Sequence, residues 1–278
     1  MASYEIRAMS FGEIIDGAFA LYRHDFGLLV GIAVITTGIP TILNVYLTAV
    51  GIELANPVLL LLWVLLLSVG GLMAGAATVW VISEIYLGME PDLGESLRFA
   101  LTKMAKLFIA GLAKYFVIWL AAVVPGAIGG VGIALAGVSV PSVMILLIAV
   151  AAGLGAVVIL ASGYAVVTQA VVLEDDTSAT DALRRSWSLT KGFKRKAFGL
   201  GVVLLVLFAV PYMVVGVLGA LVPSLEVVIA AAGGFLQLIV YPIFACAFTL
   251  LYYDLRVRNE AFDLEHLSQQ LGFDRSGE

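Results

Sequence analysis

PVLLLLWVLLLSVGGLMAGAATVWVISEIYL occupies residues 57–87, and Glu84 is the single charged residue in it. A helix needs about 20 mostly apolar residues to cross the hydrocarbon core of a bilayer. This segment is long enough to do so, and it is too apolar to face water. We therefore predict that residues 57–87 form a transmembrane helix.

The rest of the chain has the same character, with 62% hydrophobic residues, 13% charged residues and a mean hydropathy of +1.08. A soluble domain is about half apolar and roughly a quarter charged. We predict an all-α integral membrane protein of six transmembrane helices. Besides 57–87, the predicted spans are 26–50, 107–136, 141–173, 198–221 and 226–254.

Positive charge is confined to one side of the predicted protein. All 15 Lys and Arg residues lie on or next to that side, and none lies in the three short turns of the other side. Cytoplasmic loops carry the excess of Lys and Arg, so both termini are expected in the cytoplasm and the protein in the cell inner membrane. Residues 1–25 lack the features of a cleavable signal peptide, so the first span is expected to be an uncleaved anchor. The charged side receives residues 1–25, 88–106, 174–197 and 255–278, and the other side receives turns near 51–56, 137–140 and 222–225.

Three similar cap motifs precede the odd-numbered spans: Ser10 to Glu13, Asp92 to Glu95, and Ser178 to Asp181. A cap oxygen accepts the third backbone N–H, and an acid three residues on favours the start of a helix. The residues that follow place apolar side chains on one helical stripe. We predict three amphipathic helices in the plane of the membrane interface.

Prolines repeat in the same register as the caps. One set lies inside the odd spans and should kink them, and the other set begins the even spans, where a missing N–H costs nothing. We therefore predict a single domain, 1–278, of three pseudo-repeated units, each an interfacial helix followed by a transmembrane hairpin. The two proline sets are Pro40, Pro125 and Pro211, and Pro57, Pro141 and Pro223; the units are about 8–87, 90–173 and 176–256, with a cytoplasmic tail at 257–278.

Three patches together resemble a known family: MSFGEIIDGAFALYRHDFGLLVGI at 9–32, VVLEDDTSATDALRRSWSLTKG at 171–192, and LLYYDLRVRNEAFDLE at 250–265. They look like the membrane domain that accompanies some bacterial glycerophosphodiester phosphodiesterases and also occurs alone. In the fused enzymes, catalysis belongs to a separate soluble barrel with His, Glu and Asp at a metal site. These 278 residues contain no such barrel, so the resemblance implies the fold and no activity.

Residues for reaction chemistry are sparse. Cys246 is the single cysteine, so no disulfide or thiolate metal site can form within the chain. His24 and His266 lie outside the spans, which excludes a Ser–His or His-metal site inside the bilayer. We expect no enzymatic activity, no metal and no cofactor. A net charge of −5 argues against nucleic acid as a partner.

Two groups of polar residues are candidate sites. The first group lies near the charged ends of spans and consists of Glu84, Lys114, Gln169 and Asp254. We expect these residues either to form an interfacial ion pair or to snorkel to the headgroups, or else to belong to a substrate or ion pathway. The second group is a basic run that either anchors the protein or binds anionic lipid headgroups, at about 1 kcal/mol for each cation near an anionic leaflet. The basic run consists of Arg184, Arg185, Lys191, Lys194, Arg195 and Lys196.

Two functions fit these features. The first is a non-enzymatic scaffold or regulatory module that binds anionic membrane lipids or a partner protein at its cytoplasmic face. The alternative is a transporter or permease for a small or lipid-like substrate, which parallel repeats and kinked spans favour. A polar cavity lined by Asn44, Glu84, Lys114 or Gln169 would favour transport, and a packed Gly/Ala core would favour the scaffold.

Overall fold

The computed structural model describes residues 7–51, 56–174 and 177–260, and all regular structure within them is helical. Six helical segments in this part of the chain are long and apolar enough to cross a membrane, which confirms the predicted all-α fold with six candidate spans. The predicted tail beyond 260 and the turn at 52–55 lie outside the described residues. In chain order the elements are α1 (Phe11–His24), α2 (Phe26–Ala49), α3 (Pro57–Tyr86), α4 (Leu93–Ala136), α5 (Val140–Gly163), α6 (Val167–Leu173), α7 (Ala179–Leu189), α8 (Lys194–Leu221), the 3-10 turn η1 (Pro223–Leu225) and α9 (Glu226–Glu260).

Each predicted cap begins a helix. The Ser10 side chain accepts the backbone N–H of Glu13 at 3.3 Å, and the Glu13 carboxylate accepts the backbone N–H of Ser10 at 2.6 Å. The side chain of Asp92 accepts the backbone N–H of Glu95 at the start of α4, and that of Ser178 accepts the backbone N–H of Asp181 at the start of α7. The prolines also lie as predicted. Pro40, Pro125 and Pro211 are inside α2, α4 and α8, and Pro57 and Pro141 are the first and second residues of α3 and α5. Pro223 differs slightly, because it begins the turn η1 just before α9.

The boundary expected between an interfacial helix at 92–104 and a span at 107–136 is absent. α4 runs without a break for 44 residues. At 1.5 Å per residue it is about 66 Å long, roughly twice the thickness of a hydrocarbon core. The physical reason is local, because neither Gly nor Pro occurs from Glu95 to Ala110 and nothing there ends a helix.

The fourth predicted span, 141–173, is interrupted after Gly163 by a turn that separates α5 from α6. Side chains of α7 stabilise this turn. The carbonyl oxygen of Gly163 accepts the hydroxyls of Ser186 at 2.9 Å and Thr190 at 3.1 Å. The backbone N–H of Val166 donates to the Ser186 hydroxyl at 3.3 Å. Backbone groups freed by the break are thus satisfied inside the protein, as a membrane interior requires.

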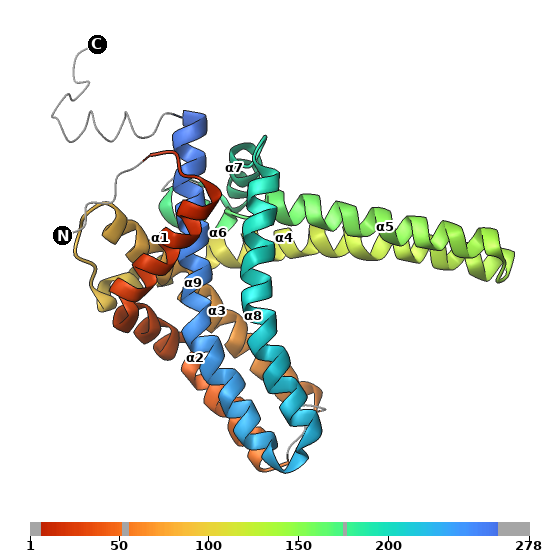
Figure 1. The fold of residues 1–278 in the computed structure, drawn as a ribbon, viewed down its shortest axis with the longest axis horizontal. Helices are drawn as coiled ribbons and strands as arrows, with labels where there is room; N and C mark the ends of the chain where they lie inside the picture. The colour runs from red at the N-terminus through yellow and green to blue at the C-terminus, as the bar shows by residue number, and fades with distance from the viewer. Residues whose placement is uncertain (1–6, 52–55, 175–176, 261–278) are drawn as a thin grey trace.

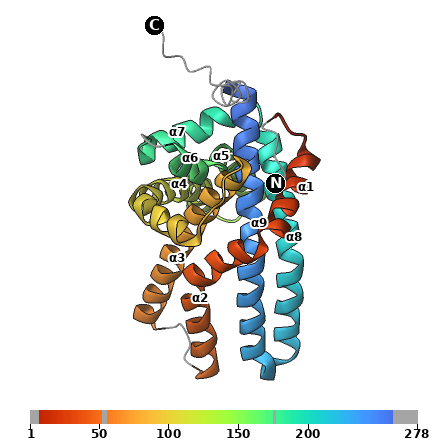
Figure 2. The same cartoon turned by 90° about the vertical axis from the view of Figure 1, so that its left-hand side faces the viewer.

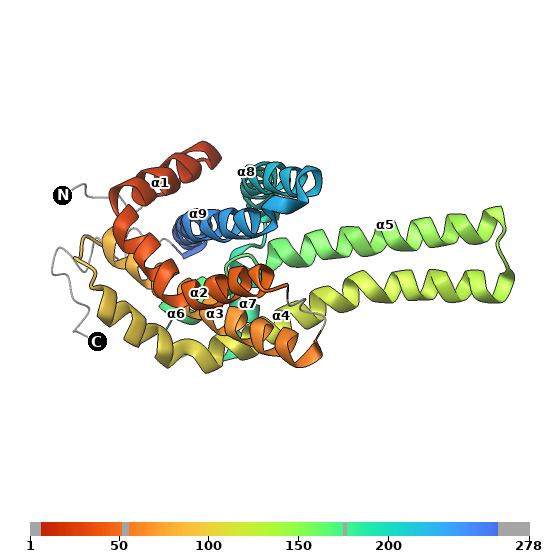
Figure 3. The same ribbon diagram turned by 90° about the horizontal axis from the view of Figure 1, so that it is seen from below.

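The spans form two groups that diverge from a common base. Helices α2, α3, α8 and α9 run in the same general direction, while the α4–α5 hairpin projects away from them (Figures 1 and 2). From below, α4 and α5 lie beside each other along the whole projecting arm (Figure 3). The base, which we call the charged end, is where α1, α7 and the C-terminal part of α9 meet (Figure 1).

Buried apolar side chains concentrate near the charged end. Ile14 of α1, Ile82 of α3, Val171 of α6 and Leu251 of α9 are all fully buried in one cluster. Farther out, the hairpins expose large apolar side chains along most of their length. Lipid solvates such surfaces in a membrane, so helix association depends on close packing and polar contacts rather than on the removal of apolar surface from water.

Candidate functional site

A fully buried carboxylate lies at the centre of the charged end. Asp254 of α9 accepts the ammonium of Lys196 at 2.5 Å, the guanidinium of Arg258 at 2.9 Å and the backbone N–H of Met9 at 2.7 Å. The carbonyl oxygen of Met9 in turn accepts Lys196 at 2.6 Å and Arg258 at 2.8 Å. These contacts join the segment before α1 to α8 and α9.

A second ion-pair group lies beside the first. Arg185 of α7 donates through Nε to Glu174 at 2.7 Å and through its two terminal nitrogens to both oxygens of Glu260. Arg256 reaches the same Glu260 at 3.0 Å, and the Tyr252 hydroxyl donates to Glu174 at 2.8 Å. Hydrogen bonds from Arg185 to Glu260 and Glu174 raise the pKa of its guanidinium further above its ordinary value. We call the two groups together the charged junction.

The charged junction stabilises the fold only while each of its buried charges keeps its partners. A buried charge is costly unless it is paired and hydrogen-bonded, and removing one partner of a buried pair costs about 3–5 kcal/mol. Every oxygen of Asp254 and Glu260 has at least one cationic donor. The charged junction therefore fixes α1, α7 and α8 on α9.

The charged junction unites the three sequence patches that carry the family resemblance. Met9 comes from the first patch, Glu174 and Arg185 come from the second, and Asp254 and Glu260 come from the third. The patches alone do not show how their charges pair. The signal available in the sequence is the spacing of acids and bases within 250–260, which places Asp254 and Arg258 one helical turn apart.

Comparison with known protein families, with curated proteins and with solved structures finds no match for this chain. The predicted relationship to the phosphodiesterase-associated membrane domain therefore stays a prediction.

The basic run is divided between structural and exposed positions. Arg185 and Lys196 belong to the charged junction. The ammonium of Lys194 lies 3.2 Å from the ring centre of Trp187, a cation–π contact. Arg184, Lys191 and Arg195 are exposed. Arg184 faces the exposed Asp181 at 3.8 Å, a surface pair that contributes little.

The four polar residues predicted near the ends of the spans do not form one cluster. Asp254 is in the charged junction, and Glu84 is half-buried near the end of α3. Lys114 of α4 and Gln169 of α6 line one half-open cavity of about 410 Å³. We call this cavity the crevice. Small-molecule sites in proteins commonly have volumes of about 300–1,000 Å³.

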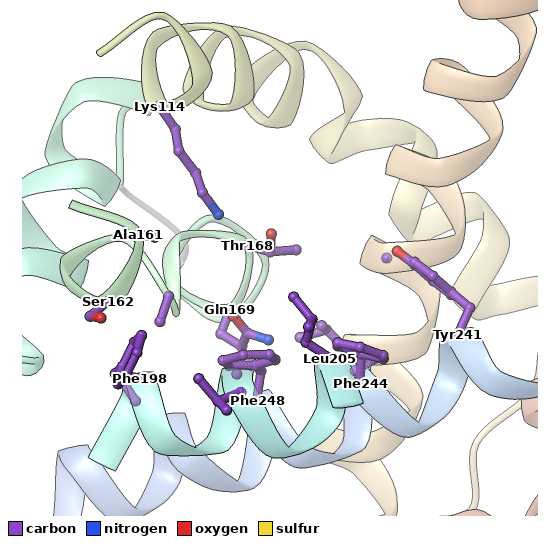
Figure 4. A pocket seen from close by; sticks show the side chains of 17 residues that line it. Lys114, Ala161, Ser162, Thr168, Gln169, Phe198, Leu205, Tyr241, Phe244 and Phe248 are labelled. Carbon is purple, nitrogen blue, oxygen red and sulfur yellow. The ribbon is translucent and has the colours of Figure 1, made fainter. Parts of the chain in front are cut away.

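Polar and apolar walls face each other across the crevice (Figure 4). Lys114 reaches in from α4 with its ammonium toward the turn of α6 that carries Thr168 and Gln169 (Figure 4). Phe198 and Leu205 of α8 and aromatic residues of α9 form the opposite wall. The crevice is thus amphipathic, with its positive charge at one side.

Neither polar side chain at the head of the crevice has a strong partner within the described chain. Lys114 forms no ion pair with a described carboxylate, and its nearest charge contact is the ring of Tyr115 at 5.7 Å. Gln169 is 3% exposed, and its carboxamide oxygen accepts no hydrogen bond. An unsatisfied buried polar group costs about 1–3 kcal/mol. The crevice therefore holds the kind of unpaired groups that a ligand would satisfy.

Within the described residues, no group of three or more His, Cys, Asp or Glu side chains is placed to hold a metal ion. Cys246 is a free, buried thiol on α9.

Proposed function

We propose that this protein is a non-enzymatic, polytopic protein of the cell inner membrane that binds anionic lipid headgroups at its cytoplasmic face, as a scaffold or regulatory module. The observation that carries the proposal is the state of the basic run. Lys191 and Arg195 are exposed and have no carboxylate partner among the described residues. Lys191 and Arg195 lie close in sequence to Arg185 and Lys196, whose ion pairs belong to the charged junction. The charged junction therefore fixes the position of the segment that carries these exposed cations.

The same proposal includes the orientation and the repeat. Both termini are assigned to the cytoplasm because Lys and Arg gather on that side. Three capped helices at Ser10, Asp92 and Ser178, each leading into a hairpin, support three units with a common orientation. A partner protein that binds the same exposed cations is the alternative occupant of this face.

The test removes the exposed cations and leaves the charged junction intact. We expect the triple variant Arg184→Gln, Lys191→Gln, Arg195→Gln to insert normally, since Lys and Arg elsewhere still set the topology. It should lose about half or more of the anionic lipid that co-purifies, because each removed cation weakens attraction to the leaflet by about 1 kcal/mol. Mass spectrometry of lipids purified with the protein measures this.

The control, Arg23→Gln with Arg98→Gln, removes exposed cations outside the basic run and should lose clearly less anionic lipid than the triple variant. A triple variant with its full anionic lipid complement contradicts lipid binding by the run and leaves a partner protein as its ligand.

A transporter for a lipid-like substrate is the second candidate, and the crevice is the observation that favours it. A further cavity of about 250 Å³, lined by Thr41, Asn44 and Gln237 among others, lies farther toward the hairpin turns. The largely apolar walls favour a lipid-like substrate over a hydrophilic one. Movement of a fluorescent phospholipid between the leaflets of proteoliposomes would distinguish this function from that of a static scaffold.

A further inference from the structure

The head of the crevice offers one cation and one amide to an anionic group. Lys114 has no described carboxylate partner, and Gln169 is almost completely buried without a partner for its carboxamide oxygen. The ammonium of Lys114 and the amide N–H of Gln169 can both donate to the oxygens of a phosphate, and the hydrogen bond from the charged group is the stronger. The carboxamide oxygen of Gln169 is an acceptor and would need a donor from another part of the ligand, such as a headgroup hydroxyl. The positive charge of Lys114 is therefore what makes the head suit an anion.

Two further cavities continue from the crevice. One, of about 490 Å³, lies between α3 and α4 and includes Gly111. The other, of about 610 Å³, lies between α8 and α9 and includes Gly201. Both share the side chain of Tyr241 with the crevice. We call these cavities the first and second slots, and their walls consist mainly of apolar side chains.

The slots run in one direction. Along α3, the first slot extends from Gly75 to Leu67, away from the charged end. Along α8, the second slot extends from Gly201 to Tyr212, again toward the hairpin turns. A polar head near the charged end and two apolar slots that lead toward the middle of the bilayer match the layout of a two-chain lipid.

We propose that the crevice binds one diacyl anionic phospholipid from the membrane, with its phosphate at Lys114 and Gln169 and one acyl chain in each slot. The apolar wall formed by Phe198 and Leu205 and the half-open side of the crevice suit a ligand that enters from lipid. This site is separate from the exposed basic run. It stands whether or not the cations at 184, 191 and 195 bind headgroups.

The first test changes the head of the site. Delipidated protein in detergent is titrated with dioleoylphosphatidylglycerol, and native mass spectrometry measures the bound fraction. We expect Lys114→Gln to weaken binding about tenfold or more, since a hydrogen bond to a charged group is lost, and Lys114→Arg to retain it. Gln169→Leu should weaken binding less. Dioleoylphosphatidylcholine should bind more weakly than phosphatidylglycerol, because its own cation faces Lys114.

The second test fills the slots. A Cβ at Gly111 or Gly201 meets no atom within 4 Å, so the side chains of Gly111→Leu and Gly201→Leu begin in open space. Gly111 lines the first slot, and Gly201 lines both the second slot and the crevice. Each should reduce the affinity for phosphatidylglycerol. Gly126→Leu on α4 and Gly216→Leu on α8 are matched controls, since their Cβ positions are equally open and lie outside the described cavities. Both controls should bind as the unmodified protein does.

Three results would overturn the proposal. One is equal phosphatidylglycerol binding by Lys114→Gln and the unmodified protein. Another is binding of soluble glycerol 3-phosphate as tight as that of the diacyl lipid, which would assign the crevice to a free phosphate ester. The third is unchanged binding by both slot-filling variants. Loss of phosphatidylglycerol binding in the triple variant of the basic run, with Lys114→Gln unaffected, would place the lipid at the surface and not in the crevice.

Discussion

The charged junction and the crevice both place polar side chains against apolar helices. The two regions differ in whether those side chains have partners within the protein. At the charged junction, Asp254 is fully buried and receives two cations and a backbone N–H. In the crevice, Lys114 and Gln169 have no such partners. Complete pairing stabilises a fold, while an unpaired buried polar group carries a free-energy cost. The contrast separates residues that hold the molecule together from residues available for function.

The largest expected effect comes from removing the buried carboxylate of the charged junction. Asp254→Asn leaves Lys196 and Arg258 without their shared counter-charge, and we expect a loss of about 3–5 kcal/mol in stability. Thermal unfolding in detergent, followed by tryptophan fluorescence, measures the change. Lys114→Gln is the matched variant at the crevice, and it should not lower the unfolding midpoint of the lipid-free protein because no internal partner is lost. Equal destabilisation by the two variants would contradict the contrast.

A smaller effect is expected where the two regions meet. A Cβ at Gly163 would lie 2.3 Å from the ring of Trp187, so Gly163→Ala forces α7 away from the end of α5. We expect about 1–3 kcal/mol of destabilisation, the usual cost of overpacking. Gly155→Ala lies on the same helix with no neighbouring atom within 4 Å and is the control. Unfolding midpoints of the two variants that coincide would show that Trp187 moves aside freely.

The smallest expected effect lies at the exposed start of α1, where the charge is paired but not buried. Hydrogen bonds from Arg7 and Ser10 lower the pKa of Glu13 to about 2. A carboxylate whose pKa is lower in the folded state stabilises that state above its unfolded pKa and loses the contribution as the pH falls. The difference in unfolding midpoint between the unmodified protein and Glu13→Gln should therefore shrink from pH 5 toward pH 2. A difference that stays constant over this range would show that Glu13 does not stabilise the cap.

Local features of the fold followed from the sequence. Spans were predictable because their length and apolar composition are properties of one segment, and caps were predictable because Ser10 and Glu13 lie three residues apart. The same holds for the turn after α4, where Gly137 has a φ of +75° that favours glycine. The continuous α4 differs from the predicted repeat because no Gly or Pro lies between Glu95 and Ala110 to end the helix.

Features that depend on distant partners did not follow. The break after Gly163 is stabilised by Ser186 of α7 and by its C-cap, Thr190. The sequence of residues 163–166 does not predict these contacts. The pairing of Met9 with Asp254 joins opposite ends of the described chain. At the candidate sites, charge density alone could not show which cations of the basic run are internal. Only packing separates Arg185 from its exposed neighbour Arg184.

The length of α4 makes it a lever. Near one end, Phe99 stacks on Trp80 of α3 with ring centres 3.8 Å apart, and the other end is the tip of the projecting arm. A transmembrane helix adjusts its tilt to the thickness of the bilayer around it. Because no break lies between Phe99 and Lys114, a tilt of the arm moves both residues together. Such a tilt would also move the α4 side of the crevice, which Lys114 lines.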